Sequence, residues 1–251
     1  MRIFNKSLAG LLFSILCTIS LFGAEPELLL RQNLSRAQPG DYLVTEQNKN
    51  YTLLIIRNRD DQFVNIEEIT VPVCRVSSRA FSWRNWIEKG APGNTSWIMY
   101  TIHLASGTVQ QTFSFTKNEW ITIPQSQHFL STLLNLPLKR VSDRERKKIG
   151  PPPASDHPDR RPYWQPRLVA EGKPIPGVAF EAWRARWPKD GSDLAGKTLE
   201  IYIPQENEKY PSYFPYWLQV YGVVGNAKVR IVDSGTALPS FYRYTGGDIG
   251  N

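Results

Sequence analysis

The chain has 251 residues, of which 41% are hydrophobic and 21% charged, with a formal net charge of +7 at pH 7. This composition is that of an ordinary globular protein and excludes a disordered, collagen-like or multi-span membrane protein. The 19 prolines and 17 glycines leave little room for long helices. We therefore expect a mainly β fold with short helices, of the α+β class.

Residues 1–24 are typical of a secretory signal peptide. Arg2 and Lys6 give a positively charged start, and an uncharged stretch of 18 residues follows from position 7 to 24. An uncleaved membrane anchor is the alternative, because roughly 17 to 25 apolar residues can span a bilayer. We expect an exported protein that is periplasmic or associated with the envelope.

Cleavage of this signal would remove Cys17 and leave Cys74 as the single cysteine of the mature chain. An internal disulfide bond is then excluded, and a chain of this length buries enough surface to fold without one. Cys74 follows an apolar, strand-like run at residues 71–73. That position favours a buried, unreactive thiol over a catalytic one.

The portion 25–150 shows the two-residue period of an antiparallel β-sheet. Its expected strands are residues 41–47, 51–56, 63–73, 97–104, 109–115 and 120–123.

Short helices are expected as an insert in this portion. One begins after the cap Ser82, and a second carries an apolar stripe along residues 129–134. A third is expected to begin at the capping-box pair Ser142 and Glu145 and to end before Gly150.

The composition changes most sharply at residues 151–167, which we call the Pro-rich segment and which includes six prolines. We interpret it as a basic linker or an extended segment that crosses the surface. The β pattern resumes in the portion 168–233, and residues 234–251 are expected to form a flexible tail. The strands expected in this second portion are residues 178–187, 199–203, 217–224 and 228–232.

The simplest architecture is one curved antiparallel sheet, completed by strands from both portions and covered by the central helices. Two separate small domains are the alternative, since both portions are long enough to fold alone.

Positive charge is concentrated in residues 139–167, which carry nine basic and four acidic residues. Such a run is usually a solvated surface. In an exported protein it also suits contact with an anionic membrane surface. The candidates for this contact are Arg144, Arg146, Lys147 and Lys148. No nucleic-acid partner is expected, because zinc-finger spacings, RNP patterns and long basic helices are absent from the sequence.

Signals for catalysis and metal binding are few. The three histidines lack the short spacings of a local metal site, so we expect no metal and no cofactor; they are His103, His128 and His157. The sequence has no G-x-S-x-G motif and no P-loop. Glycoside hydrolysis by paired carboxylates stays open, with Glu171, Glu181 and Glu200 as candidates.

Aromatic residues cluster around residues 210–217 and again at Trp183 and Trp187. These rings pack in the core, line an apolar cavity, or form an interfacial belt in which Tyr and Trp keep one polar end in water. As candidate ligand-binding residues we assign Trp183, Trp187, Tyr213 and Trp217. Leu218 and Val220 mark the core side of their strand, which places Tyr216 in the core and Trp217 on the opposite face.

Three C-terminal segments follow one another as strands joined by a Pro-aromatic step and a short turn. They are residues 199–204 (LEIYIP), 214–220 (FPYWLQV) and 227–232 (AKVRIV). This succession resembles the bacterial periplasmic lipoprotein carriers, which fold as half-barrels. The resemblance implies an antiparallel sheet curved around helices, an apolar concavity for acyl chains and no catalysis.

We therefore expect a non-enzymatic exported protein of a bacterial envelope that binds a lipid, a lipoprotein acyl chain or an envelope partner. The alternatives are a hydrolase that acts on an envelope polymer and a structural interaction protein without a small ligand. A deep apolar cavity favours the first class, an open groove with two facing carboxylates the second, and a filled core with an exposed aromatic patch the third.

Overall fold

The computed structural model describes residues 27–76, 81–122, 129–154, 157–222 and 227–239. The expected signal peptide and the last 12 residues of the expected tail lie outside the described residues. Within the described ranges, no helix is long and apolar enough to cross a membrane.

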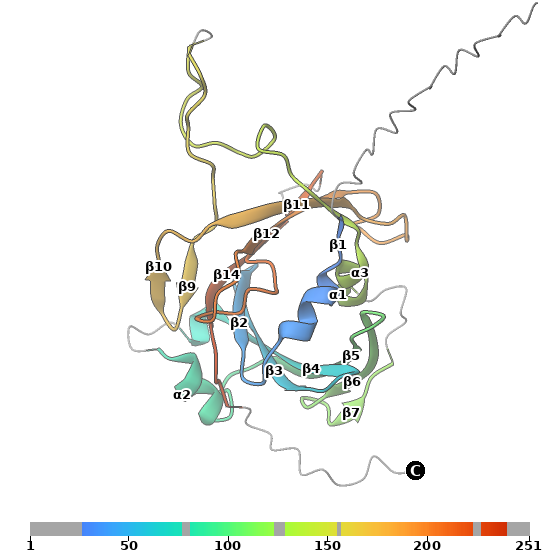
Figure 1. The fold of residues 1–251 in the computed structure, drawn as a ribbon. Coiled ribbons are helices and arrows are strands. Elements are labelled where there is room, and N and C mark those ends of the chain that lie inside the picture. The colour runs from blue at the N-terminus through green and yellow to red at the C-terminus, as the bar shows by residue number, and fades with distance from the viewer. Residues whose placement is uncertain (1–26, 77–80, 123–128, 155–156, 223–226, 240–251) are drawn as a thin grey trace, which may run out of the picture.

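The fold is mainly β and antiparallel, as predicted, and its main feature is a sheet of 12 strands (Figure 1). Neighbouring strands pair in the order β1, β8, β11, β12, β13, β14, β2, β3, β4, β5, β6 and β7. These strands are β1 (Glu27–Leu28), β2 (Tyr42–Gln47), β3 (Asn50–Arg59), β4 (Phe63–Pro72), β5 (Ser96–His103), β6 (Thr108–Ser114), β7 (Glu119–Trp120), β8 (Leu138–Arg140), β11 (Phe180–Arg186), β12 (Thr198–Pro204), β13 (Trp217–Tyr221) and β14 (Lys228–Gly235). A separate two-stranded sheet is formed by β9 (Leu168–Ala170) and β10 (Lys173–Ile175).

The helices are short. They are α1 (Leu30–Asn33), α2 (Trp83–Glu88) and α3 (Phe129–Asn135), with 3-10 turns at η1 (Leu34–Arg36) and η2 (Val73–Arg75). As expected, Ser82 caps α2, because its side chain accepts a hydrogen bond from the Asn85 amide. Pro137 follows α3 closely, where a helix cannot continue.

The first hairpin shows how the sequence sets the strand register. Asn48 and Lys49 both have positive φ angles, and they join β2 and β3 in a two-residue turn. Two successive positive φ angles define the turn type that matches the twist of the flanking strands. The register then places Leu43 opposite Leu54 on one face of the sheet.

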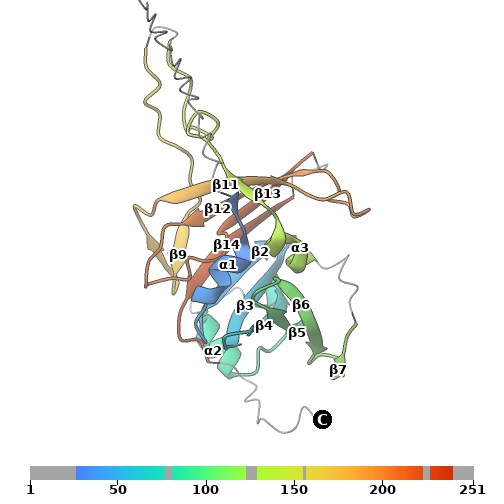
Figure 2. The same ribbon diagram turned by 45° about the vertical axis from the view of Figure 1, so that its right-hand side comes forward.

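Strands from both portions of the chain belong to the same sheet. β14 pairs with β2, and β11 pairs with β8. The Pro-rich segment leaves the sheet after β8 and returns before β9, and residues 150–154 and 157–161 project away from the sheet (Figures 1 and 2).

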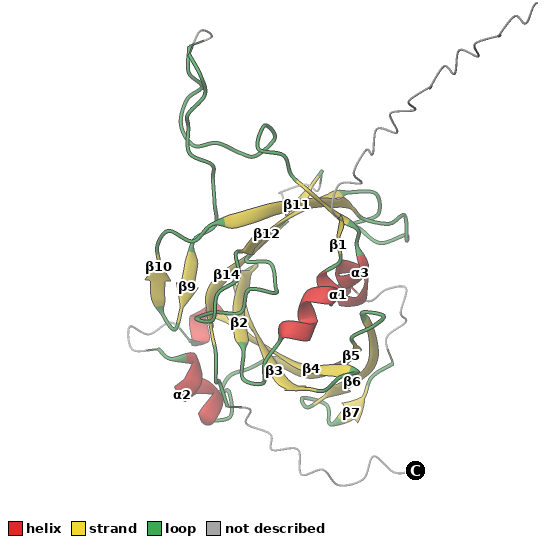
Figure 3. Ribbon diagram, viewed as in Figure 1, coloured by secondary structure: helices red, strands yellow, loops and turns green. Residues whose placement is uncertain are grey.

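Two clusters of buried apolar side chains pack against the sheet. The large core packs around α1 and α3 and includes Leu30, Leu34, Leu133 and Leu134. The small core packs around α2 and includes Trp83, Trp86 and Ile87. Figure 3 shows α1 and α3 close together, with α2 apart from them.

Three expectations about local structure are wrong. The pair Ser142 and Glu145 forms a hydrogen-bonded turn and not a third helix, because the chain after it pairs with residues 162–164. Cys74 is exposed, because the strand ends at Pro72 and the thiol lies in the following 3-10 turn. β14 continues to Gly235, and Ser234, where we expected a flexible tail to begin, is fully buried.

Candidate functional site

A cavity of about 370 Å³ lies between one face of the sheet and helix α3. Strands β2 to β5, β13 and β14 supply its floor, and the side chains that line it are mostly apolar. These apolar side chains include Leu43, Leu54, Ile66, Leu133, Leu218 and Ile231. A cavity of this size falls within the range of small-molecule sites, roughly 300 to 1,000 Å³.

Strand pairing brings these side chains together from distant parts of the sequence. Leu43, Leu54 and Glu68 lie directly opposite one another across β2, β3 and β4. Leu218 and Val229 form a second such pair across β13 and β14. Residues opposite one another in antiparallel strands share a face of the sheet.

The cavity wall contains one polar pair, Glu68 from β4 and Tyr100 from β5. The Tyr100 hydroxyl donates a hydrogen bond to the Glu68 carboxylate. Burial raises the pKa of Glu68, which the bond from Tyr100 opposes in part. Burial, together with the nearby Glu68 charge, also raises the pKa of Tyr100. The pair gives the apolar cavity a polar end that can accept and donate hydrogen bonds.

Helix α3 is held over the cavity by polar contacts on its other side. The Ser131 hydroxyl accepts a hydrogen bond from the Val109 amide of β6 at 2.9 Å. The Asn135 side chain accepts a hydrogen bond from Arg31 of α1. These contacts fix the helix so that Leu130 and Leu133 face the sheet.

The expected ligand-binding rings lie in or beside the large core. Trp183, Trp187 and Tyr213 are 8%, 4% and 4% exposed. None of the three lines the cavity. Trp187 stacks on Phe129 with ring centroids 5.3 Å apart, and Phe129 is part of the cavity wall. Trp187 therefore supports the cavity wall through Phe129, and direct ligand contact by any of the three rings stays a prediction.

Trp217 and Tyr216 occupy the environments that the strand pattern predicts. Tyr216 is 1% exposed, whereas Trp217 is half-buried on the opposite face of β13. The Trp217 ring is covered by Trp164 of the Pro-rich segment, with centroids 5.0 Å apart. Trp217 thus contacts a segment of its own chain, on the other side of the sheet from the cavity.

The four basic residues assigned to a membrane surface fall into two groups. Arg144 and Lys147 are exposed. Arg146 packs its guanidinium 4.7 Å from the Tyr163 ring centroid and donates a hydrogen bond to the Phe180 carbonyl oxygen at 3.1 Å. Lys148 forms an ion pair of 2.9 Å with Asp159. Arg144 faces water, whereas the Lys147 ammonium lies 5.4 Å from the ring centroid of Trp164. Arg146 and Lys148 contact residues 159–163 and so hold the base of the Pro-rich segment, where residues 146–150 lie beside residues 159–164.

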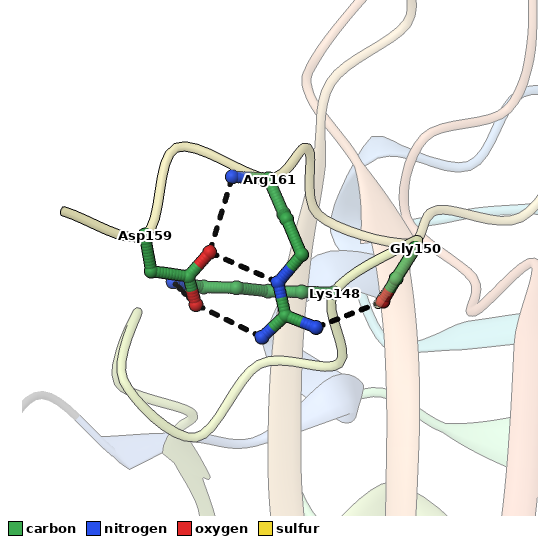
Figure 4. A network of polar contacts seen from close by, with 4 residues as sticks. All are labelled: Lys148, Gly150, Asp159 and Arg161. Atoms are coloured by element: carbon green, nitrogen blue, oxygen red, sulfur yellow. Dashed lines mark hydrogen bonds and ion pairs between the residues drawn. The ribbon is translucent and has the colours of Figure 1, made fainter. Parts of the chain in front are cut away.

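Figure 4 shows the network that closes this base. Arg161 donates hydrogen bonds to both carboxylate oxygens of Asp159, and also to the Gly150 carbonyl oxygen at 2.9 Å. Hydrogen bonds from Arg161 and Lys148 lower the pKa of Asp159. These contacts join residues 148–150 to residues 159–161 and close the loop between them.

The candidate carboxylates for hydrolysis have separate surroundings. Glu181 pairs with Arg140 at 3.1 Å, and Glu200 pairs with Arg184 at 2.9 Å. Glu171 is exposed in the turn between β9 and β10. Among the described residues, no group of three or more histidine, cysteine or acidic side chains is arranged to hold a metal ion.

Sequence reasoning missed Glu68 and Tyr100. The only sequence signal for them was the pair of neighbouring acidic residues Glu67 and Glu68 within a strand. Neighbouring strand residues point to opposite faces, so one carboxylate of the pair must face the core side of the sheet. Glu67 is fully buried and Glu68 is half-buried on the opposite face, and Glu67 forms an ion pair with Arg57.

Two comparisons with known proteins gave a match. A family model described as CT021 protein matches residues 52–176. Among solved structures, the 2.0 Å resolution structure of the hypothetical protein CT021 from Chlamydia trachomatis is similar, with a TM-score of 0.60 and 19% sequence identity. The match covers 87% of this chain and 98% of that chain. A search of curated proteins gave no match. The structural likeness shows the fold alone.

Proposed function

We propose that this chain is an exported protein of a bacterial envelope that binds an apolar or amphiphilic ligand, such as a lipid or a lipoprotein acyl chain. The observation that carries the proposal is the cavity beneath α3, with its apolar walls and the single polar pair Glu68 and Tyr100. An acyl chain buries its apolar surface against leucine and isoleucine side chains, and its polar end reaches the carboxyl and phenol groups.

The proposal includes a curved sheet that wraps the central helices and so forms a container. Register shifts in three strand pairs support it: β14 with β2, β3 with β4, and β5 with β6. Such bulges bend a strand and increase its twist. The position of α1 and α3, between β11 and β12 on one side and β3 to β6 on the other, also supports it (Figures 1 and 2).

A chain-length series of straight-chain alcohols tests the binding. Each added methylene group buried in the cavity contributes about 0.8 kcal/mol, or roughly a fourfold gain in affinity. We expect the dissociation constant to fall by that factor per carbon until the chain fills the cavity, and then to level off. The measurement is competition against a fluorescent fatty-acid probe. An affinity that does not depend on chain length contradicts the proposal.

A matched pair of variants locates the site. Leu130→Trp places a larger side chain in the cavity wall and should weaken binding at least tenfold. Ile149→Trp makes the same kind of change at a residue that is 52% exposed and outside the cavity, and should leave binding unchanged. Equal effects of the two substitutions would place the ligand elsewhere.

N-terminal sequencing of the protein from an envelope fraction tests export. We expect a mature chain that begins near residue 25, because the uncharged stretch ends at Ala24. Mature material that retains Met1 would overturn the cleaved-signal part of the proposal and favour the anchor.

A further inference from the structure

A second hollow of about 600 Å³ lies on the face of the sheet that carries the small core. Side chains from β2, β3, the start of α2, the β9–β10 turn and β14 line it. It shares no lining residue with the cavity beneath α3 among the described residues. We call it the aromatic groove, because four rings line it: Tyr42, Tyr51, Phe81 and Trp83.

The rings form a packed wall. The Trp83 ring meets Tyr51 and Phe81 edge to face, with centroids 5.5 Å and 4.6 Å away. Tyr42 is held against the backbone of Gly235, where an added Cβ would lie 2.6 Å from the Tyr42 ring. Close packing fixes the direction in which each ring faces, so the wall is formed before any ligand arrives.

Two carboxylates reach the same groove. Asp233 is 7% exposed, and one of its oxygens accepts hydrogen bonds from the amides of Gly172 and Ser234 at 3.0 Å and 2.9 Å. The Tyr42 hydroxyl also bonds to Asp233. Asp233 is therefore a buried acidic group whose position is set by three donors.

Glu171 supplies the second carboxylate from the exposed edge of the groove. It lies in the two-residue turn between β9 and β10, where both Glu171 and Gly172 have positive φ angles. Turns of this type favour asparagine, aspartate or glycine, so a glutamate there is conformationally strained.

The charge of the groove differs from that of the whole protein. Arg84 is the only basic residue among the described lining residues, and its guanidinium donates a hydrogen bond to the Ala237 carbonyl oxygen at 2.7 Å. With Asp233 and Glu171 ionised, the lining is net negative, in a chain with a formal net charge of +7. Carboxylates and aromatic ring faces both attract a cation, and rings suit one that is large and weakly hydrated.

We propose that the aromatic groove binds an organic ammonium group, with the rings of Tyr51 and Trp83 against its alkyl substituents and the carboxylates of Asp233 and Glu171 balancing its charge. The group is carried either by a free solute or by a lipid headgroup. This site is separate from the cavity beneath α3, so its test does not depend on whether the protein binds acyl chains.

The direct test compares choline with its neutral carbon analogue 3,3-dimethylbutan-1-ol, by titration calorimetry on the full chain. Choline should bind at least tenfold more tightly, because only the charged compound gains from the carboxylates and the ring faces. Equal binding of the two compounds, or binding of neither, overturns the proposal. If choline binds, vesicles of phosphatidylcholine and of phosphatidylglycerol then distinguish a lipid headgroup from a free solute.

Variants assign the site. Asp233→Asn keeps the oxygen that accepts the Gly172 and Ser234 amides but removes the charge, and it should weaken choline binding at least tenfold. Glu171→Gln changes an exposed turn and keeps the fold intact, and it should weaken binding severalfold. Glu88→Gln is the matched control, because Glu88 is exposed on α2 outside the groove. Unchanged affinity in both test variants contradicts the assignment.

Discussion

Glu68 carries a carboxyl group into an apolar wall, and its ionisation therefore works against folding. Burial raises its pKa above the ordinary value of 4.5. A raised folded-state pKa means that the contribution of this group to stability is fully present below the unfolded pKa. That contribution is lost as the pH rises through the folded-state pKa.

Glu68→Gln should consequently stabilise the protein at pH 7 and have little effect below pH 4.5. The amide keeps an acceptor for the Tyr100 hydroxyl but never carries a charge. Urea denaturation at the two pH values measures the difference. Glu208→Gln, at an exposed residue, serves as the control and should have the same small effect on stability at both pH values. A loss of stability at pH 7 would show that the ionised carboxylate is favourably bound, contrary to this prediction.

Tyr216 and Trp217 are adjacent aromatic residues with opposite roles in packing. Truncation of Tyr216 to alanine should cost roughly 3 to 5 kcal/mol, as for other large aromatic side chains in cores. Trp217→Ala should cost much less, because that ring is half-buried beneath Trp164. Denaturation midpoints in urea give both values. The reverse ranking would mean that the ring of Trp217, not of Tyr216, supports the core.

At the level of single residues, the sequence predicts which face of a strand a side chain occupies better than it predicts whether that side chain belongs to a binding site. The two-residue period of a strand gives the sides of Tyr216 and Trp217 directly. It does not tell a ring that lines a cavity from one that fills a core, so Trp183 and Tyr213 could not be placed. The role of Glu68 could not be predicted for another reason. Its surroundings are formed by β5, β14 and α3, which are distant from it in the sequence.

Among the elements, strands and hairpins follow from the sequence because their signals are local. The alternation of side chains and the turn residues Asn48 and Lys49 lie within the segments that they define. The third expected helix does not form, because residues 147–149 pair with a distant segment of the chain instead. Lys148 pairs with Tyr163, and the Lys147 carbonyl oxygen accepts a hydrogen bond from the Trp164 amide. A capping pair alone does not outweigh such tertiary pairing.

The basic residues near the Pro-rich segment differ in their roles, because Arg146 is packed against the protein whereas Arg144 and Lys147 are exposed. Charge reversal tests this difference. Arg146→Glu should destabilise the protein by about 1 to 3 kcal/mol, because the Phe180 carbonyl oxygen loses its donor and a carboxylate enters a packed site. Arg144→Glu with Lys147→Glu should cost no more than about 1 kcal/mol, mainly from the lost contact between the Lys147 ammonium and the Trp164 ring. The double variant should instead weaken binding to anionic vesicles by about 1 kcal/mol per residue, an effect that salt reduces. Unchanged vesicle binding at low salt would make these residues a solvated surface only.

On the scale of the whole molecule, both portions of the chain depend on one sheet. The N-terminal portion supplies β1 to β8, and the C-terminal portion supplies β11 to β14. They join at two places, where β14 meets β2 and where β8 meets β11. The sequence left one domain or two open, because pairing between distant strands has no local signal.

Because both portions share one sheet, we expect the protein to unfold in a single cooperative transition. Leu53 in β3 belongs to the small core and Ile201 in β12 to the large core, and both are fully buried. Either residue changed to alanine should cost about 2 to 5 kcal/mol. Because the strands are continuous, each substitution should move a single transition.

Far-UV circular dichroism and tryptophan fluorescence, followed in the same urea titration, check this expectation. The two signals should coincide in the parent protein and in both variants, since loss of β14 from β2 exposes both cores together. Two separate domains would instead give two transitions, with Leu53→Ala shifting one and Ile201→Ala the other. That outcome would mean that the contacts between β14 and β2 and between β8 and β11 add little to the stability of either portion.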